Sequence, residues 1–384
     1  MKKLILFSFI ISSQTLMAQN VGIGTTSPQA RLHITDSNVV FTGPVTVPAT
    51  TAYSPSIEDA GSRMLWYPQK AAFRVGNVNS TQWNKDSIGR YSFASGYNTK
   101  SFGEGAFASG YITTAKGIYS TAMGFGTTAS GNTSTAIGNY TFATGDYSTA
   151  MGFTTIASGD YSYVTGIYSS ATGYNSTALG SNSKASGDYS TATGYFSAAS
   201  GNFSTSMGYY TKARSFGSLV IGLANDTSDI ASPSFIDPAN RIFQIGNGTA
   251  NNARRNAITV LQNGNTGIGT TTPNQLLHVY GSATATSAKI ENGGTAEAML
   301  ELKGGGAGSR NWMVRSEGSG SAVGAGKLNF RDNTAALSRM IIDLAGNVGI
   351  GTTTPGQLLE VVGPENTSID LKPRPVTVRR TRAR

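Results

Sequence analysis

Cysteine is absent from this 384-residue sequence, so disulfides, thiol catalysis and lipoprotein anchoring are excluded together. Charged residues are scarce, at 13%, about half the share of an average soluble domain. After the first twenty residues, no stretch approaches the roughly 18 apolar residues that a membrane-spanning helix needs. Low charge with abundant glycine can indicate disorder, but disordered chains contain few aromatic residues. The 48 glycines, 17 tyrosines and 16 phenylalanines therefore favour a folded β protein rich in turns.

The first twenty residues, MKKLILFSFIISSQTLMAQN, have the layout of a secretory signal peptide. Lys2 and Lys3 supply a basic start, residues 4–11 an apolar core, and residues 16–18 (LMA) a cleavage site. A short buried helix is the alternative interpretation. The signal peptide is favoured, so we expect residues 1–18 to be removed and the mature chain to be exported without a transmembrane segment.

The net charge of +9 is unevenly distributed. Lys2 and Lys3 leave with the signal peptide, and the segment 371–384 (LKPRPVTVRRTRAR) holds six basic residues and no acidic one. The rest of the chain therefore carries only about +1, whereas a nucleic-acid binder needs a basic face across its fold. The sequence predicts no nucleic-acid partner.

Glycine recurs at position 89 and then at every seventh residue to 208; Ser215 interrupts the series and Gly222 resumes it. Alanine stands two places before most of these glycines and serine or threonine four places before, giving the unit [S/T]-x-A-x-G-x-x. Alternation inside a period of seven indicates a short strand followed by a turn. A helix is excluded, because glycine at one heptad position throughout would cost roughly 1 kcal/mol per copy.

The two faces of these strands differ. Positions −4, −2 and 0 relative to the glycine are small, which predicts a narrow interior. Position −1 alternates between successive sevens, so the true repeat is fourteen residues with two strands. In one strand this position carries Met123, Ile137, Met151, Leu179, Met207 and Ile221, interspersed with Ser95, Ser109, Thr165 and Thr193. In the other it is mostly polar: Lys116, Ser130, Thr144, Ser158, Thr172, Ser186 and Ser200.

A row of six large apolar side chains is rarely left exposed on a soluble monomer. Burying these six residues would contribute about 9–18 kcal/mol gross per chain, at roughly 1.5–3 kcal/mol each. We therefore expect self-association along the axis of the solenoid, with Met123 and the five other large residues at the interface.

The repeats over residues 86–222 follow the pattern S-T-A-M-G-x-x-T-x-A-S-G and resemble the head repeats of YadA-like trimeric autotransporter adhesins. Residues 218–222 (SLVIG) are similar to the S-V-A-I-G core of those repeats. The resemblance implies a left-handed parallel β-roll of fourteen-residue coils, a homotrimer and an adhesin function. The sequence shows no heptad stalk and no C-terminal run of amphipathic strands, so the family's route of self-transport is not expected.

A phrase N-x-G-I-G-T-T-x-P, followed by a short apolar segment, occurs at 20–34, 265–279 and 347–361. Such phrases resemble those of surface and tail-fibre-like proteins of Bacteroidetes-type bacteria, and each predicts a turn and a short strand at a module boundary. The best candidate for a buried strand before the repeats is 64–67 (MLWY). The predicted divisions are a signal peptide (1–18), an N-terminal β-rich module (19–85), the head β-roll (86–222), a connector (223–264), a β-rich fibre module (265–346) and a C-terminal phrase with the basic tail (347–384).

Little in the sequence indicates catalysis, a cofactor or a metal site, and we expect a protein that is not an enzyme. His33 and His278 occupy equivalent places in two phrases, and the third has Glu360 there, which favours a structural role. The phrases lack the third glycine of a dinucleotide fingerprint, and no G-G-x-G-x-D calcium repeat is present. No carboxylates at glycosidase spacing stand out; Asp86, Asp146, Asp160 and Asp188 are isolated, although residues distant in sequence can meet in a fold.

Aromatic residues recur at the turns. One set directly follows a glycine and comprises Tyr97, Tyr111, Phe125, Phe153, Tyr195 and Tyr209. Another follows the alternate glycines by two places and comprises Tyr91, Tyr119, Tyr147, Tyr161, Tyr189 and Phe203. Equivalent positions in successive coils lie about 4.8 Å apart, so each set should form a ladder. The first set is our ligand-binding candidate, but closure of the coil ends or of a trimer seam is the favoured alternative.

Together these features predict an all-β, exported homotrimer of the cell surface or outer membrane that binds a matrix protein or glycan, with avidity supplied by three chains. The alternative is a structural, tail-fibre-like appendage component. A fibre-borne glycan-degrading enzyme without its catalytic part is a third.

Overall fold

The computed structural model describes residues 20–35, 38–48, 54–55, 58–281, 288–306 and 308–363. The described chain is all-β, and its helices are three 3-10 turns, η1 (Pro68–Lys70), η2 (Thr81–Trp83) and η3 (Lys85–Ser87). Backbone contacts divide the chain into two units, the first ending at Tyr280 and the second beginning at Gly281. The predicted signal peptide and basic tail lie outside the described residues.

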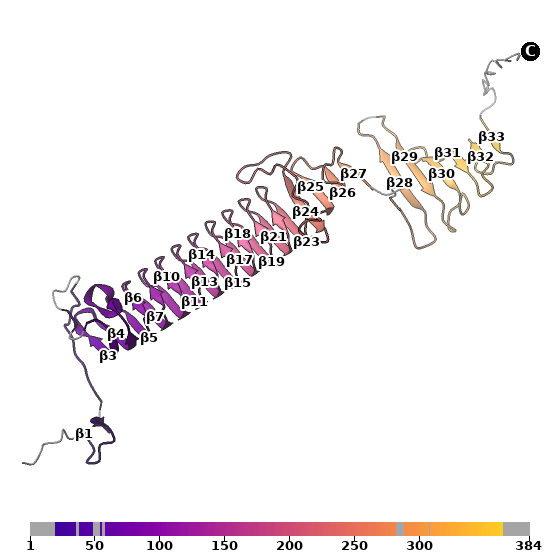
Figure 1. Cartoon of the computed structure of the whole chain (residues 1–384). Helices are drawn as coiled ribbons and strands as arrows, with labels where there is room; N and C mark the ends of the chain where they lie inside the picture. Colours follow the sequence, from indigo (N-terminus) through magenta and orange to yellow (C-terminus); the bar gives the residue numbers. More distant parts are fainter. Residues whose placement is uncertain are drawn as a thin grey trace, which may run out of the picture. The chain divides into compact units, whose positions relative to one another are not determined.

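A solenoid of fourteen-residue coils forms the centre of the first unit (Figure 1). Each coil has one five-residue strand and one two-residue strand. The long strands are β5 (Phe93–Tyr97), β7 (Phe107–Tyr111), β9 (Thr121–Phe125), β11 (Thr135–Asn139), β13 (Thr149–Phe153), β15 (Tyr163–Ile167), β17 (Thr177–Ser181), β19 (Thr191–Tyr195), β21 (Thr205–Tyr209) and β23 (Leu219–Leu223). The short strands are β6 (Lys100–Ser101), β8 (Thr114–Ala115), β10 (Thr128–Ala129), β12 (Phe142–Ala143), β14 (Ile156–Ala157), β16 (Ser170–Ala171), β18 (Lys184–Ala185), β20 (Ala198–Ala199) and β22 (Lys212–Ala213).

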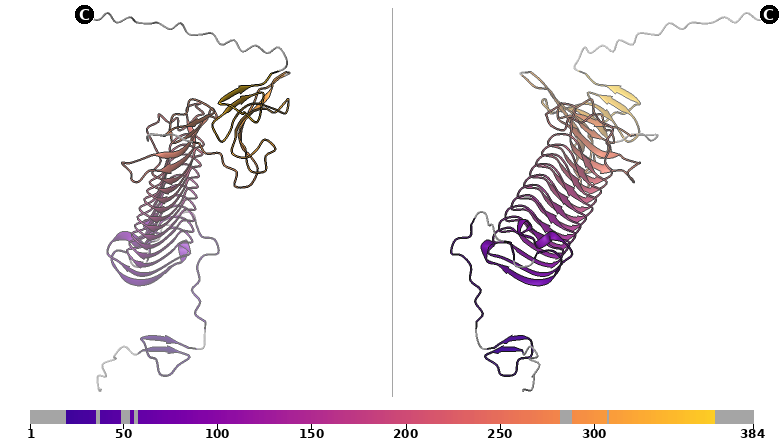
Figure 2. Two further views of the ribbon diagram at one scale, coloured as in Figure 1. Left: turned by 90° about the vertical axis from the view of Figure 1, so that its right-hand side faces the viewer. Right: turned by 60° about the vertical axis from the view of Figure 1, so that its left-hand side comes forward.

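Equivalent strands of successive coils pair in parallel and in register. Met123 lies opposite Ile137, for example, and Ile137 lies opposite Met151. The short strands form a nine-stranded sheet, and the long strands belong to a sixteen-stranded sheet that continues beyond both ends of the repeats. Figure 2 shows the coils stacked one upon the next. The prediction of a parallel β-roll with fourteen-residue coils is confirmed.

The interior of the solenoid is made of small side chains, as the repeat predicts. Position −2 is fully buried in every repeat from Ala94 to Val220; it is alanine except at Ser101, Val164, Ser206 and Val220. The serines and threonines at position −4 are buried beside them, and several close the turn locally: Ser120 Oγ donates to the carbonyl oxygen of Gly117 at 2.7 Å. The core is therefore thin and hydroxyl-lined.

The glycines are required because backbone atoms of the next coil occupy the space of a Cβ. A Cβ on Gly124 would lie 2.0 Å from the carbonyl oxygen of Gly138, and φ at Gly124 is +116°. In the alternate set, a Cβ on Gly131 would lie 1.9 Å from the carbonyl oxygen of Gly145. Ser215 interrupts the series just after β22, the last strand of the nine-stranded sheet, where no further coil of that sheet stands in the way.

The two strands of a coil differ in length, which the sequence pattern does not predict. Both halves of the repeat share one pattern, but the second forms only two residues of strand. In this half the chain bends early, because the N–H groups of Ser130 and Gly131 both approach the carbonyl oxygen of Ala143, at 2.8 and 3.4 Å. A turn then follows immediately.

An antiparallel hairpin closes the N-terminal end of the solenoid. Its strands are β3 (Gly61–Tyr67) and β4 (Ala72–Val78), and β4 pairs in parallel with β5. The predicted segment 64–67 is a strand, but only Tyr67 is buried, while Met64 is exposed on the outer face. Trp83 is fully buried and donates its Nε1–H to the carbonyl oxygen of Thr99 at 3.0 Å, which seals the first coil.

Arg74 lies inside this end of the solenoid and is fully buried. Its guanidinium donates to the carbonyl oxygens of Phe73, Ser92 and Ser101 at 2.8, 2.9 and 3.2 Å, and to Ser92 Oγ at 2.7 Å. Burial lowers the pKa of Arg74 to about 9, so the group is still charged at neutral pH. Backbone carbonyl oxygens and one serine hydroxyl, rather than a carboxylate, are the hydrogen-bond acceptors of this cation.

Four further strands close the other end: β24 (Arg241–Asn247), β25 (Asn256–Leu261), β26 (Thr266–Ile268) and β27 (Leu277–Val279). β24 pairs in parallel with β23 and antiparallel with β25. The open edge of the last short strand is covered by a side chain: Asn225 Oδ1 accepts the N–H of Lys212 at 2.7 Å, and its Nδ2 donates to the carbonyl oxygen of Lys212 at 3.1 Å. The amide of Asn225 thus stands in for a further strand.

All three phrases fold in one way, as two short parallel strands rather than a turn and one strand. They are β1 (Val21–Ile23) with β2 (Leu32–Ile34), β26 with β27, and β32 (Val348–Ile350) with β33 (Leu359–Val361). The chain divides directly after the second phrase, at Tyr280.

The second unit is one six-stranded sheet in the order β28-β29-β30-β31-β32-β33. The first four strands are β28 (Ala298–Lys303), β29 (Asn311–Ser316), β30 (Leu328–Asp332) and β31 (Leu337–Ile342). Neighbouring strands are antiparallel except for the final phrase pair, which is parallel.

Candidate functional site

A straight row of side chains follows the outer face of the sixteen-stranded sheet. Strand pairing places its members in this order: Met64, Val75, Ser95, Ser109, Met123, Ile137, Met151, Thr165, Leu179, Thr193, Met207, Ile221, Ile245, Ile258, Ile268 and Val279. We call this set the outer row. It contains all six predicted interface residues, of which Met123 and Met207 are 38% and 46% exposed. Pairing therefore brings residues spread over the repeats into one continuous line.

The sequence analysis missed the parts of the outer row that lie beyond the repeats. Val75 continues it on β4, and Ile245 and Ile258 continue it on β24 and β25. The alternation of IFQIG in β24 was the available signal. The apolar surface is thus longer than the head repeats.

The six aromatic ligand candidates lie on this same outer face. In β9, Thr121, Met123 and Phe125 alternate with buried Ala122, so each ring stands two residues from the outer row. Tyr97 stacks on Tyr111 at 4.8 Å between ring centroids, Tyr111 on Phe125 at 5.0 Å, and Tyr195 on Tyr209 at 5.3 Å. Asn139 stands in register between Phe125 and Phe153 and interrupts the ladder.

The opposite turn edge carries a second ladder. Tyr147 stacks on Tyr161 and Tyr189 on Phe203, each at 4.9 Å between ring centroids. Tyr174, which the sequence analysis did not single out, packs edge-on between Tyr161 and Tyr189. Stacking covers the ring faces within each pair, so a ligand meets ring edges and hydroxyls there.

Polar side chains run beside the second ladder and link successive coils. Asp146 Oδ1 accepts the N–H of Asn132 at 2.7 Å, and Asp160 Oδ1 accepts the N–H of Asp146 at 2.9 Å. Asp188 accepts the N–H of Tyr174 in the same way, at 3.0 Å. These aspartates, predicted as isolated, bind the backbone of the preceding coil.

One turn position of every half-coil has an unusual backbone conformation; it is occupied by Tyr147, Tyr161 and Tyr189, but not by Tyr97 or the rest of the first aromatic set. Every seventh residue from 91 to 224 has positive φ, and only 105, 126 and 217 of these are glycine. The others are Tyr91, Asn98, Ile112, Tyr119, Thr133, Tyr140, Tyr147, Thr154, Tyr161, Tyr168, Asn175, Asn182, Tyr189, Phe196, Phe203, Tyr210 and Ala224. A non-glycine residue in this region costs roughly 1–2 kcal/mol, so the coil turns are strained throughout.

The outer face of the short strands is more polar. Thr144, Ser158 and Thr172 are exposed there, one per coil, as the sequence predicts. Phe142 and Ile156 are apolar exceptions on the same face, and Ile156 is exposed. The solenoid therefore has one largely apolar and one largely hydrated side.

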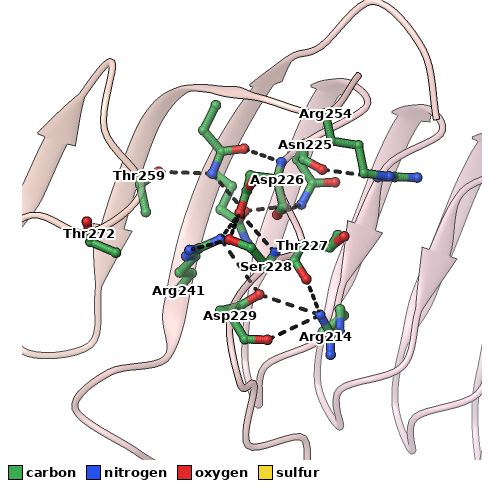
Figure 3. Close-up of polar contacts among 12 residues, drawn as sticks. Arg214, Asn225, Asp226, Thr227, Ser228, Asp229, Arg241, Arg254, Thr259 and Thr272 are labelled. Carbon is green, nitrogen blue, oxygen red and sulfur yellow. Dashed lines mark hydrogen bonds and ion pairs between the residues drawn. The ribbon is translucent and has the colours of Figure 1, made fainter. Parts of the chain in front are cut away.

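A polar network holds the C-terminal end together (Figure 3). Arg241 Nη1 contacts Asp226 Oδ1 at 2.5 Å, and Ser228 donates to the same oxygen from Oγ at 2.6 Å and from N–H at 3.0 Å. Burial alone would raise the pKa of Asp226, but these donors outweigh it and hold that pKa below its ordinary value. The network fixes the loop that leaves the last coil.

His33 has the structural role expected of it in the phrases, whereas His278 Nδ1 is buried without a hydrogen-bond partner. His33 Nδ1 accepts the N–H of Gln29 at 3.0 Å, and Glu360 Oε2 accepts the N–H of Gly356 at 2.7 Å in the third phrase. Either acceptor caps the phrase loop, which explains the exchange between histidine and glutamate. Within the described ranges, no group of three or more His, Asp or Glu side chains is placed to hold a metal ion. No helix in the described part of the chain is long and apolar enough to cross a membrane.

The geometry defines a parallel β-solenoid with two aromatic edges and one apolar face. The family model of the YadA head domain repeat (2 copies) matches residues 87–111, 115–141, 143–162 and 171–197. The solenoid therefore contains YadA head repeats within residues 87–197, and the chain is similar in this part to trimeric autotransporter adhesins. No curated protein matches the sequence.

Proposed function

We propose that three copies of this chain pack their outer faces together and form an exported, non-enzymatic surface adhesin. The observation that carries the proposal is the outer row, which runs from Met64 to Val279 without a charged residue. Such a face is poorly suited to water, and copies of the same face are its simplest complement.

Mass measurement tests the trimer. Replacing Met123, Ile137 and Met151 with lysine should convert a three-chain particle into monomers or aggregates, measured by light scattering and sedimentation. The matched control places three lysines on the hydrated side, at Thr144, Ser158 and Thr172, and should leave the mass unchanged. A first variant that stays trimeric would overturn the assignment of the interface.

We further propose that the aromatic edges bind a matrix protein or a glycan, with avidity from three chains and repeated coils. Tyr97 and its five companions border the proposed trimer seam, whereas the rings around Tyr161 lie at the other turn edge. The exposed fractions of Tyr147, Tyr161 and Tyr189 are 54%, 49% and 47%, which favours this second edge as the one a ligand meets.

Binding of the full-length protein to collagen, fibronectin and glycan arrays tests this second part. Serine at Tyr147, Tyr161 and Tyr189 should weaken binding more than serine at Tyr111, Tyr195 and Tyr209. Absence of binding across such panels, with the trimer intact, would instead favour a structural, tail-fibre-like role. Detection of the protein on intact cells by surface labelling tests export.

A further inference from the structure

The sheet of the second unit has two unlike faces. One face carries a central row formed by Leu300, Val314, Phe330, Met340, Ile350 and Val361, which pair across all six strands. A neighbouring row adds Leu328, Ile342, Val348 and Leu359. We call this side the apolar face. Leu300 is 49% exposed and Ile350 43%, so the described residues leave it open to solvent.

The other face is covered by the unit's own loops over the central strands β30 and β31, although its first strand, β28, stays exposed. Ile341 and Asn329 are fully buried there, and Asn329 Nδ2 donates to Glu317 Oε1 at 2.5 Å. Lys327 Nζ donates to the carbonyl oxygen of Thr353 at 2.7 Å, which ties the phrase loop to this side. Because a sheet must bury its hydrophobic side against a second layer, the apolar face is the side that still needs one.

The repeated phrase relates this face to the first unit. Ile258, Ile268 and Val279 form the end of the outer row, through β25, β26 and β27. The equivalent residues at the third phrase and in the strand before it are Met340, Ile350 and Val361, in β31, β32 and β33, with identical pairing. The apolar face is therefore the counterpart of the outer face on which the first unit is proposed to self-associate.

We propose that the apolar face of the second unit is a self-association surface, buried against the same face of other copies of this chain. The unit would then act as an assembly element separate from the head repeats. The number of associating copies rests on the proposed function, whereas the assignment of the apolar face as a self-association surface does not.

The charges of the unit agree with a copy as the occupant. At one end of the apolar face, Asp332 is buried between Arg310 and Arg339, so its charge is already neutralised within the chain. No charged residue lies in the central row. The central row thus offers a charged partner nothing to pair with, whereas an identical apolar face is complementary.

The absence of native cysteine makes single-cysteine variants of the full chain informative. Leu300→Cys is on the apolar face, and Met299→Cys, its neighbour, is on the opposite face with a similar exposure of 38%. If copies cover the apolar face, a bulky maleimide should label Leu300→Cys at least about tenfold more slowly than Met299→Cys, a difference of about 1.4 kcal/mol in protection. Equal rates would overturn the proposal.

A second pair separates this inference from the head trimer. Ile137→Cys reports on the outer row and Thr144→Cys on the hydrated side, with the same reagent. Protection at Ile137 without protection at Leu300 leaves the head trimer standing and rejects the inference. Protection at Leu300 without protection at Ile137 supports the inference and rejects the head interface. Circular dichroism of each variant shows that its sheets are formed.

Discussion

The carbonyl oxygen of Gly152 lies 2.1 Å from the point that a Cβ on Gly138 would occupy. The same contact recurs from coil to coil along the long strands, because each glycine meets its equivalent fourteen residues later. A backbone carbonyl cannot move aside as a flexible side chain can, so this position accepts glycine alone.

Alanine at Gly138 should therefore be severely destabilising, by more than about 3 kcal/mol of unfolding free energy, because of the clash and its φ of +133°. Alanine at Gly217 is the matched control: φ is +63°, but no atom lies within 4 Å of the added Cβ. It should cost only about 1 kcal/mol. Urea denaturation of both variants measures the difference, and equal losses would contradict the steric explanation.

Replacing a β-branched residue at a left-handed turn position should stabilise the solenoid. Thr133 and Thr154 have φ of +54° and +52°, a region that asparagine tolerates better than threonine. Thr133→Asn and Thr154→Asn should each raise the unfolding free energy by up to about 1 kcal/mol. The reverse change at Asn175, with φ of +51°, should lower it by a similar amount. Opposite signs in these denaturation measurements would show that backbone strain is not the cause.

Lowering the pH should destabilise the C-terminal end of the solenoid before it destabilises the repeats. The pKa of Asp226 is lowered in the folded state, so its contribution to stability is fully present above its unfolded value of about 3.9. That contribution is lost as the pH falls from there through the lower folded value. Hydrogen exchange of β24 and β25 between pH 5 and about 3 measures the effect. In Asp226→Asn this pH dependence should be reduced; an unchanged profile would assign it to other carboxyl groups.

Lysine should not preserve the stability that Arg74 provides. A single ammonium cannot reach the carbonyl oxygens of Phe73, Ser92 and Ser101 together, and at least one buried acceptor loses its donor. We expect Arg74→Lys to lower the unfolding free energy by about 1–3 kcal/mol. Arg90→Lys, in a partly exposed pair with Glu104, should cost less than about 1 kcal/mol. Similar losses in the two variants would argue against a special role for the buried guanidinium.

The periodic features of the fold were predictable from the sequence. Alanine and glycine at fixed offsets specify which face is inside, and Met123 and Ile137 are fourteen residues apart, so in-register pairing must align them. The unequal strand lengths were not predictable, because the two halves of the repeat share one pattern and differ in where the chain bends.

The parts outside the repeats depend on contacts that sequence spacing does not encode. Asn225 reaches the edge of the strand that contains Lys212 through its side chain, and Arg74 fills the first coil with no acidic partner to mark it. The aromatic candidates at Tyr97 and Phe125 were predicted as a ladder, but their position beside the outer row follows from strand parity at Met123. This alternation is visible in the sequence, but the sequence analysis did not use it to place the aromatic residues beside the outer row.

In-register stacking makes the reach of the solenoid adjustable in whole steps. Deleting or duplicating fourteen residues between two equivalent turns would change its length by about 4.8 Å and would leave every row continuous. A change of seven residues would instead place a two-residue strand where a five-residue strand is paired. Recombination between repeats can therefore lengthen or shorten this protein in evolution without redesign of its two ends.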